Sequence, residues 1–234
     1  MTTQQYSISP IGYLNSPYKE KFAVPRQPNL APSVRSQIKL CHHVNHPDSV
    51  RGLDAFSHLW LLFLFDQNIA AGWKPTVRPP RLGGNQRVGV FASRATFRPN
   101  HIGMSVVKFE GIIHVNGQYY VEVSGADLVD NTPIIDIKPY LPYADGIDDA
   151  QGGYAPEPPT RFEVVFDMTA QHQLERCGDR DYRRQVISEV LSQDPRPAYK
   201  KQHDDKVYSV RLFDWDVKFQ FQGNRIAVLS IEDF

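Results

Sequence analysis

The sequence predicts a mainly β protein with a small mixed α+β unit at its C-terminal end. Short apolar runs of strand length recur from residue 6 to residue 137, with no long helical pattern between them. Asn116-Gly117 separates two of these runs, and this dipeptide favours the tight turn of a β-hairpin. Farther along, one helical pattern lies among strand patterns. Many short strands favour a barrel or a sandwich for the first domain.

The first domain is expected to span residues 1–145. Its expected strands are the segments in which apolar and aromatic residues dominate, namely 6–14, 59–65, 87–92, 105–115, 119–124 and 133–137. Residues 16–28, SPYKEKFAVPRQP, contain too much proline for a helix and predict a polar loop. Proline on both sides of Arg26-Gln27 lowers the entropy that the loop would lose on binding a ligand.

Residues 146–159 are expected to form a linker, because glycine, proline and acidic residues dominate there. The second domain, residues 160–234, begins with apolar residues at every other position from 162 to 166, as in a strand. Helical spacing follows over residues 182–191, and Asp194-Pro195 ends that helix. The remaining apolar runs predict strands at 207–212, 217–221 and 226–231, with Gly223-Asn224 as a hairpin turn.

Composition narrows the class of protein. The chain has 234 residues and balances 26 basic against 26 acidic side chains, so a nucleic-acid site would have to be a local patch. Cys41 and the nearby histidines His42, His43 and His46 have no second ligand group at a zinc-site spacing, so no metal site is expected. The longest apolar run, residues 59–65, is far too short to cross a bilayer, and a soluble, cytoplasmic protein is expected. Serine-hydrolase, P-loop and dinucleotide-fold motifs are missing.

Two groups of polar residues are candidates for chemistry. The first is a local basic patch within about two dozen positions, made of Arg78, Arg81, Arg87, Arg94 and Arg98. Arginine offers paired donors to phosphate or carboxylate, although exposed loop arginines are often only solvated. The second group is acidic: Asp127 and Asp130 flank a turn, and Phe65-Asp66 joins a ring face to a carboxylate at the end of an apolar strand. That pair suits an adenine or a sulfonium centre.

Five motifs follow one another in the order and spacing of the TrmO family, also called TsaA-like proteins: SPYKEKFAVPRQP, VRGLDAFSHLW, RPPRLGG, FASRATFRPN and DLVDNTPIIDIKPYLPYAD. The resemblance resumes at DPRPAY, residues 194–199. It implies a tRNA methyltransferase that uses S-adenosylmethionine to methylate N6 of threonylcarbamoyl-adenosine (t6A to m6t6A) beside the anticodon. It also implies a β-barrel catalytic domain in place of the Rossmann-like sheet, and a homodimer.

The resemblance assigns roles to matching positions. Cofactor contacts are expected at Pro25, Arg26, Gln27, Phe65, Asp66, Arg94, Met104, Asp127, Leu128, Val129 and Asp130. For the phosphates of the tRNA anticodon loop, the candidates are Arg78, Arg81, Arg98 and Lys200, with Arg196 and Lys201 extending that surface. The group that accepts the proton is not identified; its candidates are Asp127, Asp130, Asn100 and Tyr140.

One position departs from the family pattern. His101 stands where members of the family usually carry proline, so the loop is either less rigid here or unaffected. Two other function classes stay open. The first is a non-catalytic RNA- or nucleotide-binding β-barrel module that uses the same arginines. The second, which ranks last, is a small-molecule hydrolase built on the aspartates and His58, for which no organised nucleophile is visible.

Overall fold

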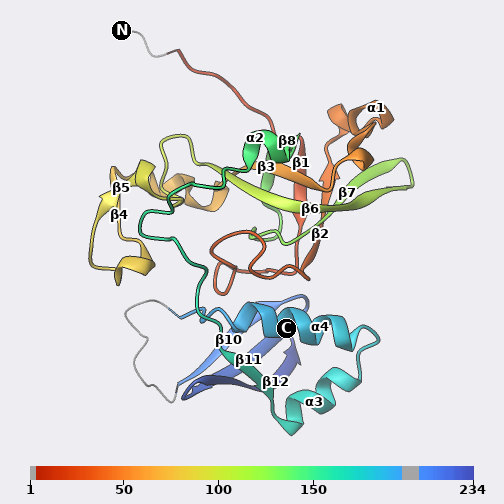
Figure 1. Cartoon of the computed structure of the whole chain (residues 1–234). Coiled ribbons are helices and arrows are strands. Elements are labelled where there is room, and N and C mark those ends of the chain that lie inside the picture. The colour runs from red at the N-terminus through yellow and green to blue at the C-terminus, as the bar shows by residue number, and fades with distance from the viewer. Residues whose placement is uncertain (1–3, 197–205) are drawn as a thin grey trace.

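The computed structural model describes residues 4–196 and 206–234 (Figure 1). Six antiparallel strands close into a barrel in the order β1-β2-β7-β6-β3-β8, because β8 pairs with β3 on one side and with β1 on the other. These strands are Gly12–Asn15 (β1), Arg35–Leu40 (β2), His58–Leu64 (β3), Ile102–Val115 (β6), Gln118–Ser124 (β7) and Pro133–Pro139 (β8). The mainly β prediction for the first domain is therefore confirmed.

Strand β3 illustrates how the sequence divides its side chains between two environments. Leu59, Leu61 and Phe63 are buried inside the barrel, whereas the residues between them, Trp60 and Leu62, are half-buried on the outer face. This is the two-residue alternation of a strand. The outer face of β3 is consequently available to line a site.

The longest hairpin of the barrel joins β6 to β7. Asn116 and Gly117 take positive φ values of 51° and 76°, as a type I′ turn requires, and Val115 pairs with Gln118. The hairpin predicted at this dipeptide is confirmed. The hairpin predicted at Gly223-Asn224 is also present, since Gln222 pairs with Arg225.

Short elements fill the connections of the first domain. They are His42–Val44 (η1), Pro47–Val50 (α1), Leu53–Ala55 (η2), Asp66–Ala71 (η3), Thr76–Val77 (β4), Pro80–Leu82 (η4), Val88–Gly89 (β5), Val90–Ala92 (η5) and Pro142–Asp145 (α2). Residues 66–98, here called the arm, run outward from the barrel on the left of Figure 1. In the arm, β4 pairs only with β5. None of the described helices is long and apolar enough to cross a membrane.

The second unit is a four-stranded sheet in the order β10-β11-β12-β9, packed against two helices (Figure 1). Its elements are Glu163–Phe166 (β9), Met168–Glu175 (α3), Arg180–Leu191 (α4), Val207–Leu212 (β10), Trp215–Gln222 (β11) and Arg225–Asp233 (β12). β9 is parallel to β12, and the other neighbours are antiparallel. The predicted mixed α+β character is thus observed.

The segment predicted as a polar loop, residues 16–28, instead joins the two units. Tyr18 is only 1% exposed and forms an isolated β-bridge with Leu212 of β10. Ala23 and Val34 belong to the apolar core of the second unit although they precede β2 in the chain. The loop assignment holds, but its polar character does not, because its apolar side chains complete the core of the other unit.

Two other predictions need correction. The strand predicted at 87–92 is a strand only at Val88–Gly89, because Val90–Ala92 turns into a 3-10 helix. The strand predicted at 6–14 begins at Gly12, where pairing with β2 and β8 starts. Several elements were not predicted, among them β2 and α3. β2 has one exposed polar face, and α3 buries only Ala170 and Leu174, so neither shows a clear apolar pattern.

Candidate active-site cleft

A large cleft lies where the barrel, the arm and the second unit meet. It has a volume of about 2600 Å³, which exceeds the 300–1,000 Å³ common for small-molecule pockets. Its walls come mainly from seven parts of the chain, which lie within residues 23–27, 60–68, 74–98, 102–104, 127–129 and 151–160 and, in the second unit, 193–196. A cleft of this size has room for more than one ligand.

The residues predicted to hold the cofactor come together in this cleft, with one exception. Those that line it are Pro25, Arg26, Gln27, Phe65, Asp66, Arg94, Met104, Asp127, Leu128 and Val129. The exception is Asp130, whose carboxylate accepts hydrogen bonds from Lys19 Nζ and from the Ser16 backbone N–H, both at 2.8 Å. Asp130 lines a separate shallow groove and fixes a loop there, so its predicted cofactor contact is not supported by its position.

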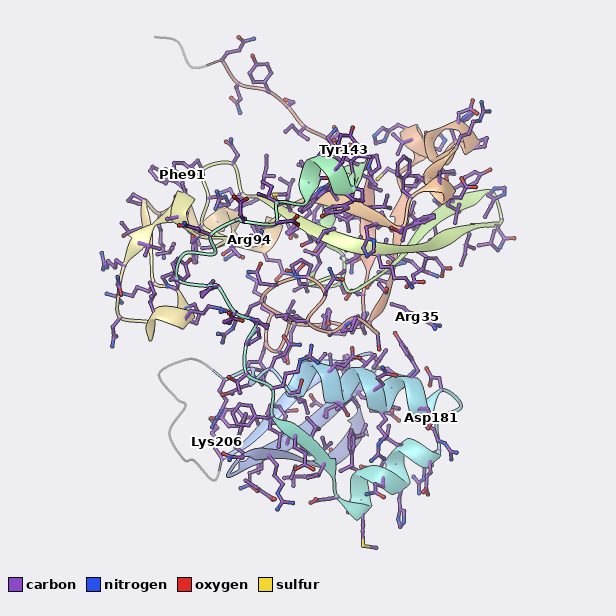
Figure 2. The ribbon with its side chains drawn as sticks, in the orientation of Figure 1. Arg35, Phe91, Arg94, Tyr143, Asp181 and Lys206 are labelled. Atoms are coloured by element: carbon purple, nitrogen blue, oxygen red, sulfur yellow. The ribbon has the colours of Figure 1, made fainter. Side chains whose placement is uncertain are left out.

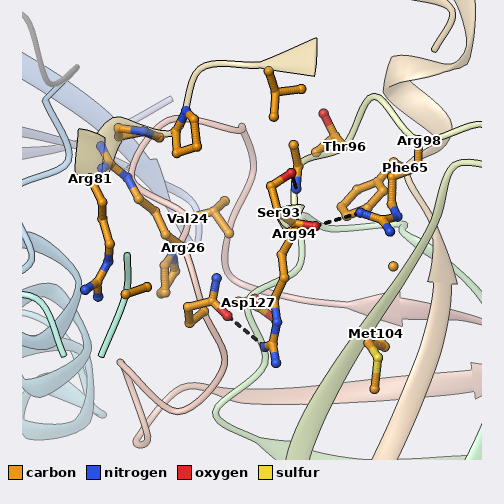
Figure 3. A pocket seen from close by; sticks show the side chains of 18 of the residues that line it. Val24, Arg26, Phe65, Arg81, Ser93, Arg94, Thr96, Arg98, Met104 and Asp127 are labelled. Atoms are coloured by element: carbon orange, nitrogen blue, oxygen red, sulfur yellow. Dashed lines mark hydrogen bonds between the residues drawn. The ribbon is translucent and has the colours of Figure 1, made fainter. Parts of the chain in front are cut away.

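Arg94 connects the arm to the loop of residues 16–28. Its Nη1 donates to Gln27 Oε1 at 2.8 Å, as the lower dashed line in Figure 3 shows. The guanidinium lies near Asp127, and its positive charge favours the ionised form of that carboxyl. Arg94 therefore presents a cation in the middle of the cleft.

Asp127 is the cleft carboxyl with the most perturbed chemistry. Burial raises its pKa to about 6, although the hydrogen bond that Ser105 Oγ donates to Oδ1 and the charge of Arg94 favour ionisation. Ser105 points into the barrel from β6 and is buried. A carboxyl that titrates near neutral pH is suited to proton transfer.

Arg196 was predicted to extend the surface that contacts the tRNA phosphates, but it is buried. Its side chain is 5% exposed and pairs with the equally buried Asp194 at 2.8 Å. The guanidinium carbon lies 3.3 Å from the ring centroid of Phe221. The carbonyl of Arg196 accepts a hydrogen bond from Arg26 Nη2 at 3.2 Å. Arg196 is therefore a structural residue that orients Arg26, and not a phosphate contact.

The other residues predicted to contact phosphate differ in whether their side chains already hydrogen-bond within the protein. Arg98 Nη1 donates to the Ser93 carbonyl at 2.8 Å and to the Val90 carbonyl at 3.2 Å, so Arg98 ties the arm together (Figure 3). Arg81 Nη1 donates to the Glu157 carbonyl in the segment expected to be a linker, residues 146–159. Arg78 has no partner among the residues that the structure describes. Lys200 and Lys201 lie outside the described residues.

Asn100 and Tyr140, the weak candidates for proton acceptor, do not line the cleft. Tyr140 packs on Trp60 instead, with ring centroids 5.9 Å apart. His101 adopts a positive φ of 52°, a conformation that the ring of proline forbids. The turn at His101 therefore differs from any turn that a proline at this position would form.

Two residues at the site were not predicted from the sequence. Trp60 lines the cleft, and the buried Ser105 donates to the Asp127 carboxylate from inside the barrel. Both sit in ordinary strand patterns, and only the closed barrel brings them to the site. The segment expected to be a linker also forms part of the wall, where Tyr154 Oη donates to the Ala92 carbonyl at 3.2 Å. In the described part of the chain, no three metal-ligating side chains gather into a group.

The cleft combines carboxylates, aromatic rings and a row of cations on the arm, an arrangement suited to a nucleotide-like ligand together with a polyanion. Models of known families specify the class further. The chain belongs to the tRNA-methyltransferase O family, whose N-terminal domain matches residues 13–146 and whose C-terminal domain matches residues 159–234.

Known proteins resemble the chain over almost its whole length. The tRNA (adenine(37)-N6)-methyltransferase of Escherichia coli K12 is 46% identical over 230 residues, which cover 97% of this chain and 98% of that protein. RcsF of Pseudomonas aeruginosa, a putative S-adenosylmethionine-dependent methyltransferase, is 47% identical over 229 residues, 97% of each. The crystal structure of TrmO from Pseudomonas aeruginosa superposes with a TM-score of 0.81 at 39% identity and covers 98% of this chain and 99% of that one.

Proposed function

We propose that the protein transfers a methyl group from S-adenosylmethionine to N6 of threonylcarbamoyl-adenosine in tRNA, next to the anticodon. It is an S-adenosylmethionine-dependent tRNA methyltransferase that acts on adenine 37, as its relative from Escherichia coli is named. The observation that carries the proposal is that one cleft joins the expected cofactor residues to the cationic arm. Homodimer formation and a cytoplasmic location stay predictions from the family resemblance.

The residues of the cleft fit the cofactor. Phe65 and Asp66 offer an aromatic face and a carboxylate, which suit a positively charged sulfonium. Arg94 offers a guanidinium for the carboxylate of the amino-acid part. Leu128 and Val129 line the cleft and would hold the adenosine part with apolar surface and backbone groups. When bound, S-adenosylmethionine supplies an electrophilic methyl group.

The protein has two tasks in the reaction. The cleft must hold N6 in line with the methyl carbon, because fixed geometry supplies much of the acceleration in transfer reactions. It must also receive the proton that N6 loses as the N–CH3 bond forms and the bond between the methyl carbon and sulfur breaks, which leaves the sulfur as a neutral thioether. Of the candidates for this role, only Asp127 lines the cleft, and its pKa of about 6 leaves it ionised but readily protonated near neutral pH. We therefore assign the proton to the Asp127 carboxylate.

The proposed reaction is tested with purified protein, S-adenosylmethionine and two tRNA preparations that differ only in the threonylcarbamoyl group. Nucleoside mass spectrometry is expected to reveal one added methyl group on threonylcarbamoyl-adenosine and none on plain adenosine at the same position. Methylation of plain adenosine at equal rate would contradict the specific substrate. Saturable RNA binding without any methylation would instead favour the non-catalytic binding module.

Replacing Arg94 by alanine is expected to weaken cofactor binding about 10- to 100-fold, because a charge-assisted contact and the Arg94–Gln27 link are both lost. Isothermal titration calorimetry with S-adenosylmethionine measures this change. Arg81→Ala is the matched control, since Arg81 lines the same cleft but bonds the Glu157 carbonyl. It should leave cofactor affinity unchanged and reduce tRNA affinity together with its salt dependence. Equal effects of both variants on the cofactor would contradict the assignment.

A further inference from the structure

Phe91 is an exposed aromatic residue on the wall of the cleft. Its side chain is 76% exposed, although the ring lies on the arm among residues that line the cleft (Figure 2). A single exposed apolar residue is common on protein surfaces and indicates nothing by itself. Its surroundings therefore decide whether the ring has a purpose.

The backbone that carries Phe91 is held in place on both sides. Val90 is buried, and its carbonyl accepts hydrogen bonds from Arg98 Nη1 at 3.2 Å and from Ser93 Oγ at 2.9 Å. On the following residue, the Ala92 carbonyl accepts a hydrogen bond from Tyr154 Oη at 3.2 Å. The ring is therefore presented from a fixed turn.

One face of the Phe91 ring has an arginine beside it. The guanidinium carbon of Arg98 lies 5.8 Å from the ring centroid, within the range of a cation–π contact. The large exposure of the side chain leaves remaining ring surface open to solvent. An open aromatic face with a cation behind it is the arrangement on which single-stranded nucleic acids stack their bases.

The charge of the arm identifies the kind of partner. The arm has six basic side chains against one acidic side chain, Asp66 at its first position, in a chain whose formal net charge is zero. The six are Lys74, Arg78, Arg81, Arg87, Arg94 and Arg98, and all of them line the cleft. A surface of this kind attracts a phosphate backbone and repels a second copy of itself.

We propose that Phe91 is a stacking platform for an unpaired base of the tRNA anticodon loop, next to the base that is methylated. The inference rests on the proposed function for the presence of RNA in the cleft. Stacking there would hold the loop open, while the cations of the arm contact its phosphates. Phe91 then positions the substrate and takes no part in the bond changes.

The test compares Phe91→Ala and Phe91→Trp with Tyr143→Ala, in the full-length protein. Tyr143 is 87% exposed and does not line the cleft, so it controls for the loss of an exposed aromatic side chain (Figure 2). With an anticodon stem-loop RNA that carries the threonylcarbamoyl group, Phe91→Ala is expected to raise KM for RNA roughly 5- to 150-fold, the range of one lost stacking contact. Phe91→Trp and Tyr143→Ala should keep KM near the wild-type value, and cofactor affinity should stay constant in all three.

Abasic RNAs make the test specific for stacking. Each unpaired nucleotide of the loop is replaced in turn by an abasic one, and KM is measured for wild type and Phe91→Ala. At one position the two proteins should become equal, because the base that Phe91 contacts is then missing. No such position, or loss of a dimer in Phe91→Ala with unchanged KM for RNA, would overturn the proposal. If the wild-type protein still methylates this RNA, the proposed function stands even though the stacking proposal fails.

Discussion

Replacing Asp194 by alanine is expected to lower the free energy of unfolding by about 3 to 5 kcal/mol, the cost of leaving a buried partner charge unpaired. Asp194 and Arg196 are both at most 5% exposed, and Arg196 Nε and Nη2 donate to the two carboxylate oxygens at 2.8 and 3.1 Å. The second unit should unfold at a lower urea concentration, measured by circular dichroism. Arg26 should also lose its orientation, because it donates to the Arg196 carbonyl.

Two further variants separate charge from backbone geometry. Asp194 has a positive φ of 51°, which asparagine tolerates better than alanine. Asp194→Asn keeps that preference and should still lose most of the stability if the charge is what matters. The double variant Asp194→Asn/Arg196→Met removes both charges, keeps a residue that tolerates the positive φ, and should recover much of the loss. A loss below about 1 kcal/mol in Asp194→Ala would show that the pair is not buried as described.

Local sequence patterns predicted those elements whose stability is decided locally. The Asn116-Gly117 hairpin follows from two residues that tolerate positive φ, and the strand at Val207–Leu212 alternates buried and exposed residues throughout. β2 escaped prediction because RSQIKL places only Ser36, Ile38 and Leu40 inside, and a serine among them breaks the apolar pattern. Its place as a strand depends on its neighbours in the barrel.

The site follows a similar division. The residue types in PRQ, Phe65-Asp66 and DLVD, with the family resemblance, predicted a set that the fold does gather, except for Asp130. Asp127 and Asp130 are three residues apart in one turn, yet the first faces the cleft and the second binds Lys19 on the other side. The burial of Arg196 could not be predicted either, because arginines are mostly exposed and the sequence does not show that Phe221 packs against this one.

Replacing Asp127 by asparagine is expected to reduce the rate of methyl transfer at saturating substrates about 100-fold or more, the usual contribution of a positioned proton acceptor. Asparagine keeps the size of the side chain but cannot take the proton. The wild-type rate should rise with pH up to about 6, where the carboxyl becomes ionised, and then level off. The variant should lack that rise. Single-turnover assays from pH 5 to 8 measure both profiles, from about one unit below the pKa of Asp127 to about two units above it.

Asp130→Asn is the matched control, since Asp130 belongs to the same turn but not to the cleft. It should lose only its ion pair with Lys19, worth up to about 1 kcal/mol, and keep the rate within a few-fold. If both variants lose the rate equally, the turn and not the carboxylate is what the reaction needs.

The substitution Asp127→Asn should also make the protein more stable at neutral pH. The folded-state pKa of Asp127, about 6, lies above the value near 3.9 expected for an unfolded chain, so the folded state binds the proton more tightly. The free energy of unfolding of the wild type therefore falls as pH rises from about 4 to about 6, by up to about 3 kcal/mol. Asp127→Asn cannot ionise and should not show this fall. A variant that is slower and yet more stable above pH 6 would mean that the buried carboxyl is retained for its chemistry; a variant with unchanged stability across this range would contradict the raised pKa.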